Sequence, residues 1–313
     1  MRFVAKRLIN LIFTVLIVSF LAFCAFQIIG DPVARMLGSE ATPEMVEQLK
    51  EELGFNRPLM TRYLEWAGNF LKGDMGMSYS YKMPVSEMVL PKLGTTVALT
   101  LMAFLMTCVL SISIGLYQVR LKSPRIDRIM TVVNQLVMSI PPFFIGILFT
   151  CIFGLVFRWF TPGYFISFRD DPLGFFGYLF LPALSIAIPK ISQAVKMLRS
   201  QTGAELEKDY IRTAYSRGMN TGAAVNRHAL HNAIIPVISF LAVSLAEMLA
   251  SCIIIEQIFS IPGIGRLLLS SIGSRDFTVV LAIVVILVIW VILVNWAADI
   301  IYPLIDPRIK VKK

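Results

Sequence analysis

Several common catalytic motifs are missing from this 313-residue sequence. It has no G-x-x-x-x-G-K-[ST] phosphate loop, so it does not hydrolyse ATP by that route, and it has no H-E-x-x-H zinc motif. Its only histidines, His228 and His231, are too few for a metal site, and its 4 cysteines share no disulfide or metal spacing. These absences argue against an enzyme and leave a transporter, a channel or a subunit of a larger assembly.

Charged residues are also scarce. They make up 16% of the chain against about 25% in a soluble domain, while hydrophobic residues reach 57% against about 45 to 50%. A helix needs about 20 apolar residues to cross the hydrocarbon layer of a bilayer. The sequence therefore predicts an all-α membrane protein with six transmembrane helices, placed at Leu8–Gly30, Leu93–Val119, Ile129–Phe157, Pro172–Pro189, Ala229–Met248 and Phe277–Ala298.

The positive charges indicate how these helices are oriented, because cytoplasmic loops of membrane proteins are enriched in Lys and Arg. If the N-terminus is inside, the inner segments hold 18 of the 29 basic residues and 5 of the 20 acids, whereas the outer segments hold 11 and 13. The inner segments are then 1–7, 120–128, 190–228 and 304–313. The net charge of +9 therefore indicates topology in a lipid bilayer and not nucleic-acid binding, and both termini are expected in the cytoplasm.

The predicted organisation has five parts in chain order. These are a cytoplasmic N-terminus (1–7), the first transmembrane helix (8–30), an extracytoplasmic segment (31–92), a five-helix core with a cytoplasmic coupling loop (93–303, loop 190–235) and a cytoplasmic tail (304–313).

The extracytoplasmic segment is patterned like folded structure. Thr42 is placed to cap an amphipathic helix that begins at Pro43 and ends at Gly54, and a second short helix is expected from Pro58 to Leu71. Both helices are expected to lie on the outer membrane surface or on neighbouring spans.

The loop between the fourth and fifth spans is the most informative stretch. It is polar, basic and longer than the 12 to 15 residues above which loops are usually functional or disordered, by a rough rule. Its composition predicts two short helices, Glu205–Ser216 and Ala223–Asn232, joined by a turn at Gly218. Such a pair suits docking to a soluble partner.

Glu247 is the one carboxylate well inside a predicted span. A central acid costs about 2.5 to 3.5 kcal/mol on insertion, so acids inside membranes usually face a bundle interior or water. Glu247 is thus a candidate intramembrane polar site, and a hydrogen-bonded contact between helices is an equally good interpretation.

The 190–235 loop resembles the cytoplasmic signature of permease subunits from bacterial ABC importers, in the dipeptide, oligopeptide and nickel branch. The residues that carry this resemblance are Asp209, Arg212, Thr213, Ala214, Gly218, Arg227, His228 and Leu230. Two positions depart from the family pattern: Arg212 replaces a glutamate, and the closing proline is absent at His231 and found at Pro236.

The resemblance extends along nearly the whole chain. A second signature follows the fifth span, with Glu256, Phe259, Pro262, Gly263 and Gly265. Shorter matches are Gly30-Asp31-Pro32, Leu53-Gly54, Arg57-Pro58, Gly73-Asp74 with Gly76, Ser139-Ile140-Pro141 with Gly146, Arg275-Asp276 and Asp306-Pro307-Arg308. Their order favours the subunit with a long outer segment after its first span.

The resemblance implies a type I importer in the bacterial inner membrane. Its expected partners are a second homologous permease, two ABC ATPase subunits and an extracytoplasmic substrate-binding protein. ATP and Mg would be bound by the ATPases, so this chain needs no cofactor or metal of its own. Di- or oligopeptides are the expected substrates, with import of nickel or a metal chelate, or a stand-alone secondary transporter, as alternatives.

Overall fold

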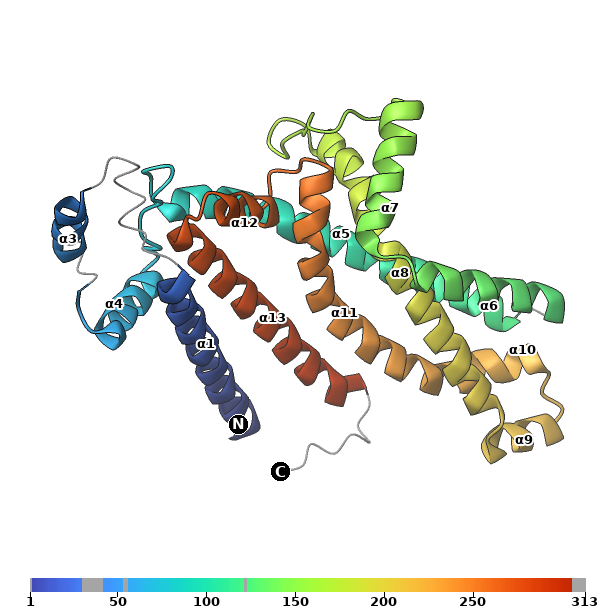
Figure 1. Ribbon diagram of the computed structural model, residues 1–313. Helices are drawn as coiled ribbons and strands as arrows, with labels where there is room; N and C mark the ends of the chain where they lie inside the picture. The colour runs from blue at the N-terminus through green and yellow to red at the C-terminus, as the bar shows by residue number, and fades with distance from the viewer. Residues whose placement is uncertain (1, 30–41, 53–55, 121–122, 306–313) are drawn as a thin grey trace. The chain divides into compact units, whose positions relative to one another are not determined.

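The computed structural model describes residues 2–29, 42–52, 56–120 and 123–305. Gly54, Gly30-Asp31-Pro32 and Asp306-Pro307-Arg308 lie outside these ranges. The described residues are helical throughout, apart from loops and one isolated bridge (Figure 1). The elements are α1 (Arg2–Ile29), α3 (Pro43–Glu52), α4 (Leu59–Leu71), α5 (Val85–Arg120), α6 (Pro124–Met138), α7 (Pro142–Phe149), η1 (Thr150–Val156), α8 (Pro172–Leu206), α9 (Asp209–Ser216), α10 (Thr221–Ala224), η2 (Val225–Ala229), α11 (Leu230–Ile258), α12 (Ile264–Gly273) and α13 (Phe277–Ile305).

Four described helices are long and apolar enough to cross a membrane: α5, α8, a helix from Gly222 to Ile258 that includes α11, and the Phe277–Ala298 part of α13. The last of these has the predicted bounds. The part of α1 whose side chains are described includes a shorter apolar stretch, Ile12–Ala25. The described residues thus bear out an all-helical membrane protein, while a count of six spans stays a prediction.

The span predicted over 129–157 is bent in the structure. Helix α6 ends at Met138, and the following helix, α7 with η1, begins at Pro142 after a bend of 94°. The break falls at the prolines because Pro141 and Pro142 have no backbone N–H to continue the ladder of α6. The pair is therefore a broken span or a re-entrant element.

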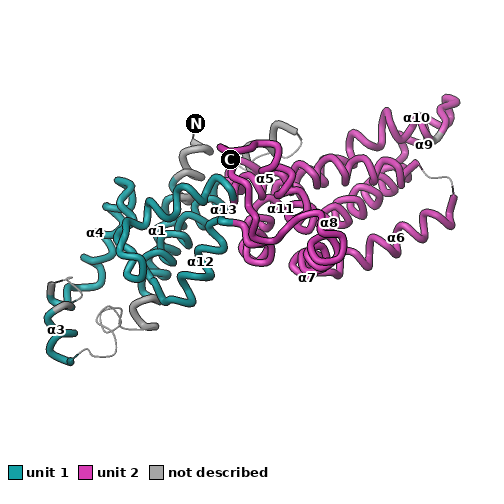
Figure 2. The backbone as a smooth tube through the Cα atoms, turned by 90° about the horizontal axis from the view of Figure 1, so that it is seen from above, with its two compact units in different colours: residues 1–95, 262–293 teal, residues 96–261, 294–313 magenta. Residues whose placement is uncertain are grey.

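The chain divides into two compact units (Figure 2). Unit 1 comprises 1–95 and 262–293, and unit 2 comprises 96–261 and 294–313. Within unit 1, an aromatic cluster joins α1, α4 and α13 around Phe23, Tyr63, Leu281 and Val285. The Tyr63 hydroxyl donates to the Leu16 carbonyl at 3.0 Å. The short helix α4 therefore packs on the neighbouring helices α1 and α13, which is one of the two arrangements expected for it.

A buried carboxylate orders another part of unit 1. Asp276 is fully buried directly before α13, and it accepts hydrogen bonds from the Ser78 hydroxyl at 2.5 Å and the Ser80 amide at 3.1 Å. Its other oxygen lies 3.5 Å from the Val279 amide in the first turn of α13, as a capping residue does. One side chain thus begins a helix and holds the 78–80 turn.

The core of unit 2 lies between α5, α7, α8 and α11. Its fully buried members include Leu99, Leu179, Met248, Ile255 and Phe259. Gly146 of α7 permits close packing here, because a Cβ at this position would lie 2.9 Å from Ile255 Cδ1. This core holds α8 and α11 side by side, and both helices lead toward the 209–230 segment.

Candidate functional site

The residues that carry the resemblance cluster in the segment 209–230, which we name the coupling segment. Helix α9 ends in a Schellman motif at Gly218, whose φ is +84°. The Gly218 amide donates to the Tyr215 carbonyl at 2.9 Å, and the Met219 amide donates to the Ala214 carbonyl at 3.2 Å. The predicted glycine turn is confirmed in its geometry.

One face of α9 is buried against the residues that follow the turn. Ile211 and Ala214 are buried, and Ile211 packs with Ala224 and Ala229 in a small apolar cluster. The opposite face of α9 exposes Asp209, Arg212 and Thr213. The coupling segment is therefore a compact piece with a polar outer surface.

The exposed charges of α9 are only weakly engaged. Arg212 and Asp209 form an ion pair of 3.5 Å whose side chains are 75% and 97% exposed. Exposed pairs of this kind contribute about 0 to 1 kcal/mol. Both groups are consequently available to a partner at little cost.

The two predicted helices have different bounds from those expected. Glu205 and Leu206 belong to the end of α8, because Lys208 has an extended backbone that separates α8 from α9. The second helix is not a separate short one. From α10 it continues through a π-helical stretch, η2, directly into α11, so this helix is an extension of a long apolar helix.

A cavity of about 600 Å³ lies beside α9. Its lining residues are Glu205, Lys208, Tyr210, Arg227, His228, His231, Asn232, Ile235 and Pro236. The Tyr210 hydroxyl donates to Glu205 at 2.6 Å and accepts from the Asn232 amide at 3.1 Å, which ties α9 to the start of α11. Burial of this hydroxyl, and then its bond to Glu205, raise the pKa of Tyr210, so it stays a neutral donor.

Glu247 forms an ion pair with Lys190 of α8. The Lys190 side chain is 15% exposed and that of Glu247 is 55% exposed, and the Lys190 ammonium lies 6.0 Å from the centre of the Phe240 ring. Lys190 was missed as a partner because it follows the predicted fourth span directly and looks like the first residue of a loop. The continuation of α8 to Leu206 instead places it inside a long helix.

The second signature begins inside the core of unit 2. Glu256 is fully buried on α11 and accepts a hydrogen bond of 2.5 Å from Thr96 of α5. The Phe259 carbonyl accepts a bond of 2.6 Å from the Tyr178 hydroxyl, and its ring stacks on Phe160 at 5.7 Å. These contacts hold the end of α11 against α5 and α8.

The rest of that signature belongs to unit 1. Pro262 leads into Gly263, which has extended backbone at the start of α12, and Gly265 is buried in the first turn. The signature residues thus lie at a helix end and a helix start, and they position backbone elements. Among the described residues, no group of three or more His, Cys, Asp or Glu side chains is arranged to hold a metal ion.

Comparison with known proteins identifies the family. The family described as "Binding-protein-dependent transport system inner membrane component" matches residues 108–311. A companion family, "Binding-prot-dependent transport system membrane comp, N-term", matches residues 1–100.

Curated relatives match over nearly their full length. A putative peptide transport system permease protein of Brucella abortus is 32% identical over 308 residues, covering 98% of each chain. The oligopeptide transport system permease protein AppB of Bacillus subtilis is 30% identical over 90% of each chain. The glutathione transport system permease protein GsiC of Salmonella typhi is 30% identical over 100% of each chain. With its apolar helices and its two family matches, this chain belongs to the inner membrane components of binding-protein-dependent transport systems.

Proposed function

We propose that this chain is the transmembrane permease subunit of an ATP-driven ABC importer, and that it translocates di- or oligopeptides delivered by an extracytoplasmic binding protein. The observation that carries the proposal is the family match over residues 1–100 and 108–311. Because the sequence has no phosphate loop, the energy must come from separate ATPase subunits.

Peptides are favoured as substrate by the names of the relatives, which refer to peptides, oligopeptides and glutathione. Nickel and metal-chelate import, the alternative within the branch, has no such support among these relatives. A stand-alone secondary transporter is disfavoured, because the family consists of components that work with a binding protein.

The proposed assembly has this chain beside a second homologous permease, with two ATPases on the cytoplasmic side. The chain would cross the bacterial inner membrane six times with both termini in the cytoplasm. Two features support this: the described spans α5, α8, α11 and α13, and the excess of Lys and Arg in the segments assigned to the inside.

In this account the coupling segment transmits ATPase motion to the spans. Moving a two-state equilibrium from about 1:99 to 99:1 takes about 5.5 kcal/mol of differential binding. An exposed ion pair that Arg212 or Asp209 forms with the ATPase would supply at most about 1 kcal/mol of this. The ATPase must therefore contact the coupling segment over a large interface. The apolar cluster around Ile211 lets the coupling segment move as one piece.

Reconstitution tests the proposal. The chain is co-expressed with a homologous permease and ABC ATPases from the same genome, purified, and placed in liposomes with the binding protein inside or outside. We expect the ATPases to co-purify and labelled di- or oligopeptide to accumulate only with ATP. Uptake by the permease without ATPases, or driven by an ion gradient, would rule the proposal out.

A further inference from the structure

Helix α6 has its polar side turned inward. Asp127, Thr131 and Asn134 recur at spacings of four and three residues and share one face, which lies against α5 and α8. The opposite face is exposed and apolar, with Ile126, Ile129, Val132, Val133 and Leu136. An inward polar face in a membrane protein requires polar partners from neighbouring helices.

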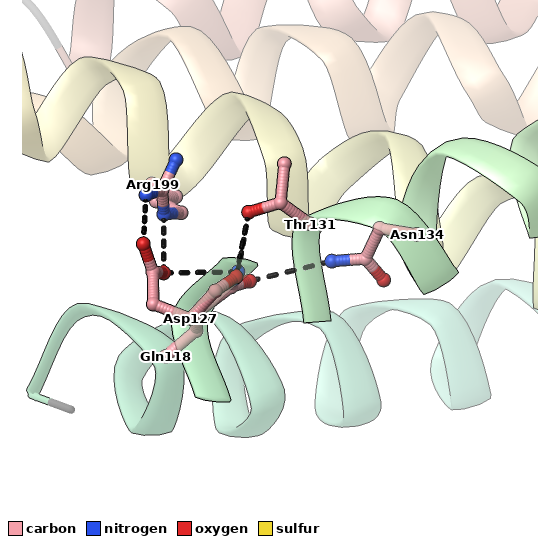
Figure 3. Close-up of polar contacts among 5 residues, drawn as sticks. All are labelled: Gln118, Asp127, Thr131, Asn134 and Arg199. Carbon is pink, nitrogen blue, oxygen red and sulfur yellow. Dashed lines mark hydrogen bonds and ion pairs between the residues drawn. The ribbon is translucent and has the colours of Figure 1, made fainter. Parts of the chain in front are cut away.

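The partners form one network, which Figure 3 shows. Gln118 of α5 is buried, and its amide nitrogen lies 3.4 Å from both Asp127 Oδ1 and Thr131 Oγ1, while its oxygen accepts from Asn134 at 3.3 Å. Arg199 of α8 holds Asp127 with two bonds, one from Nε at 2.8 Å and one from a terminal nitrogen. A single carboxylate thus connects three helices.

The space beside this network is too small for a substrate. The crevice lined by Gln118, Thr131, Asn134, Lys196 and Arg199 has a volume of about 20 Å³. A single water needs about 10 to 15 Å³ of such space, so the crevice has room for one water and for no part of a peptide. The network is consequently a contact between helices and not a binding subsite.

The position of Arg199 along the chain gives this contact a role. Helix α8 continues without a break from Arg199 to Leu206, which is about two turns, and α9 of the coupling segment begins at Asp209. Asp127 lies in the first turn of α6, and α6 leads to the 94° bend before α7. The ion pair therefore links the helix that carries α9 to the helix that enters the bend.

We propose that Asp127 and Arg199 are positioning residues for transport, which carry displacement of the coupling segment from α8 to α6 and its bend. The proposal rests on the permease function proposed above. A doubly bonded Arg–carboxylate pair is suited to this role because its two parallel bonds fix orientation as well as distance. The buried Gln118 holds the carboxylate in place from the third helix.

The test uses the complete reconstituted transporter. It compares two single variants that neutralise one charge each, Asp127→Asn and Arg199→Gln, with the double variant that carries both substitutions. The readout is solute transported per ATP hydrolysed, measured beside the amount of assembled complex. We expect each single variant to lower this ratio by roughly tenfold, within the roughly 5- to 150-fold range typical of coupling between sites. The combination should be no worse than either single variant, because both remove the same link.

Gln135→Ala is the matched control. Gln135 accepts a bond of 2.8 Å from Lys196, so this substitution removes another polar contact between the same two helices. We expect it to leave the ratio unchanged. A purely structural role of the ion pair would lower the amount of complex and not the ratio.

Two results would overturn the inference: an unchanged ratio in the single variants, or a combined loss of roughly a hundredfold, which would mean that the residues act independently. If a neutral variant does not assemble, the charge-swapped double variant Asp127→Arg with Arg199→Asp is measured instead. It restores an ion pair between α6 and α8, so the inference requires that solute transported per ATP return to within about twofold of the wild type. Wild-type uptake is measured first. If the wild-type transporter shows no ATP-driven uptake, the proposed function is contradicted. If wild-type uptake is normal and the variants are unaffected, only this inference is contradicted.

Discussion

At the scale of single residues, the Lys190–Glu247 pair shows how this chain places charge among apolar helices. Either charge alone would be costly in a span, and pairing offsets part of that cost. Because Lys190 is nearly buried while Glu247 is half exposed, losing the carboxylate leaves the more buried charge without its partner. The pair therefore supports the interpretation of Glu247 as a helix contact, while a role in binding substrate stays a prediction.

Glu247→Gln tests what the carboxylate contributes to stability and to transport. We expect it to lower uptake and to reduce the free energy of unfolding by about 1 to 3 kcal/mol, the usual penalty for an unsatisfied buried polar group. Thermal unfolding in detergent and peptide uptake give the two readouts.

Lys190→Met combined with Glu247→Gln is the companion variant. It removes both charges, so stability should return to near the wild-type value. If uptake also returns, Glu247 is a structural contact. A stable double variant that still fails to transport would assign Glu247 to the substrate translocation path.

A second residue-scale prediction concerns Glu256. Thr96→Val removes the donor of its 2.5 Å hydrogen bond without changing the shape of the side chain, and losing a hydrogen bond to a buried polar group costs about 1 to 3 kcal/mol. We expect a loss of stability in that range, measured by thermal unfolding of the purified chain.

Thr107→Val is its control on the same helix. Thr107 is equally buried, but its hydroxyl bonds only to the Ala103 carbonyl one turn earlier. Its loss should be clearly smaller, and equal losses would mean that the bond to Glu256 is not what stabilises this site.

At the scale of elements, the turn at Gly218 is the feature on which the coupling segment depends. A positive φ of +84° disfavours side chains, most strongly β-branched ones, although no neighbouring atom lies within 4 Å of a Cβ built there. Strain, and not a clash, is therefore the expected cost of substitution.

We expect Gly218→Val to leave insertion and ATPase activity intact while it lowers transport per ATP by about tenfold, within the range for coupling between sites. Gly218→Asn should be milder, since Asn tolerates this backbone region. Gly203→Val, at an exposed glycine within α8 that also has open space, controls for the added side chain. Normal uptake by Gly218→Val at normal protein level would contradict the coupling role.

The elements also show what sequence alone could predict. The Phe277–Ala298 span, the helix over 59–71 and the glycine turn follow from local patterns, and each is present. The continuation of α8 beyond Pro189 to Leu206 does not follow from such patterns. Packing of α8 in the unit 2 core stabilises the helix across prolines that would end an isolated one.

Some candidate-site residues were likewise predictable from the sequence, and others were not. The coupling segment is contiguous in sequence, so a motif could predict it. The Asp127–Arg199 and Lys190–Glu247 pairs join residues 72 and 57 positions apart, and only the packing of α8 against α6 and α11 brings them together. Because the two partners of each pair are not part of one local sequence pattern, the sequence alone does not predict either ion pair.

At the scale of the whole molecule, the account requires the coupling segment to face the cytoplasm, where ATPase subunits can reach it. The distribution of Lys and Arg predicts this orientation, and every transport prediction above depends on it. Thr213 is a suitable reporter because it is exposed on α9 and its hydroxyl bonds only within its own helix, to the Asp209 carbonyl at 3.1 Å.

The most direct test is labelling of Thr213→Cys by a membrane-impermeant maleimide, in a variant whose 4 native cysteines are replaced by alanine. We predict labelling in inside-out vesicles that lack the ATPase subunits, protection when the ATPases are bound, and no labelling in intact cells. Labelling in intact cells would place the coupling segment outside and contradict the account.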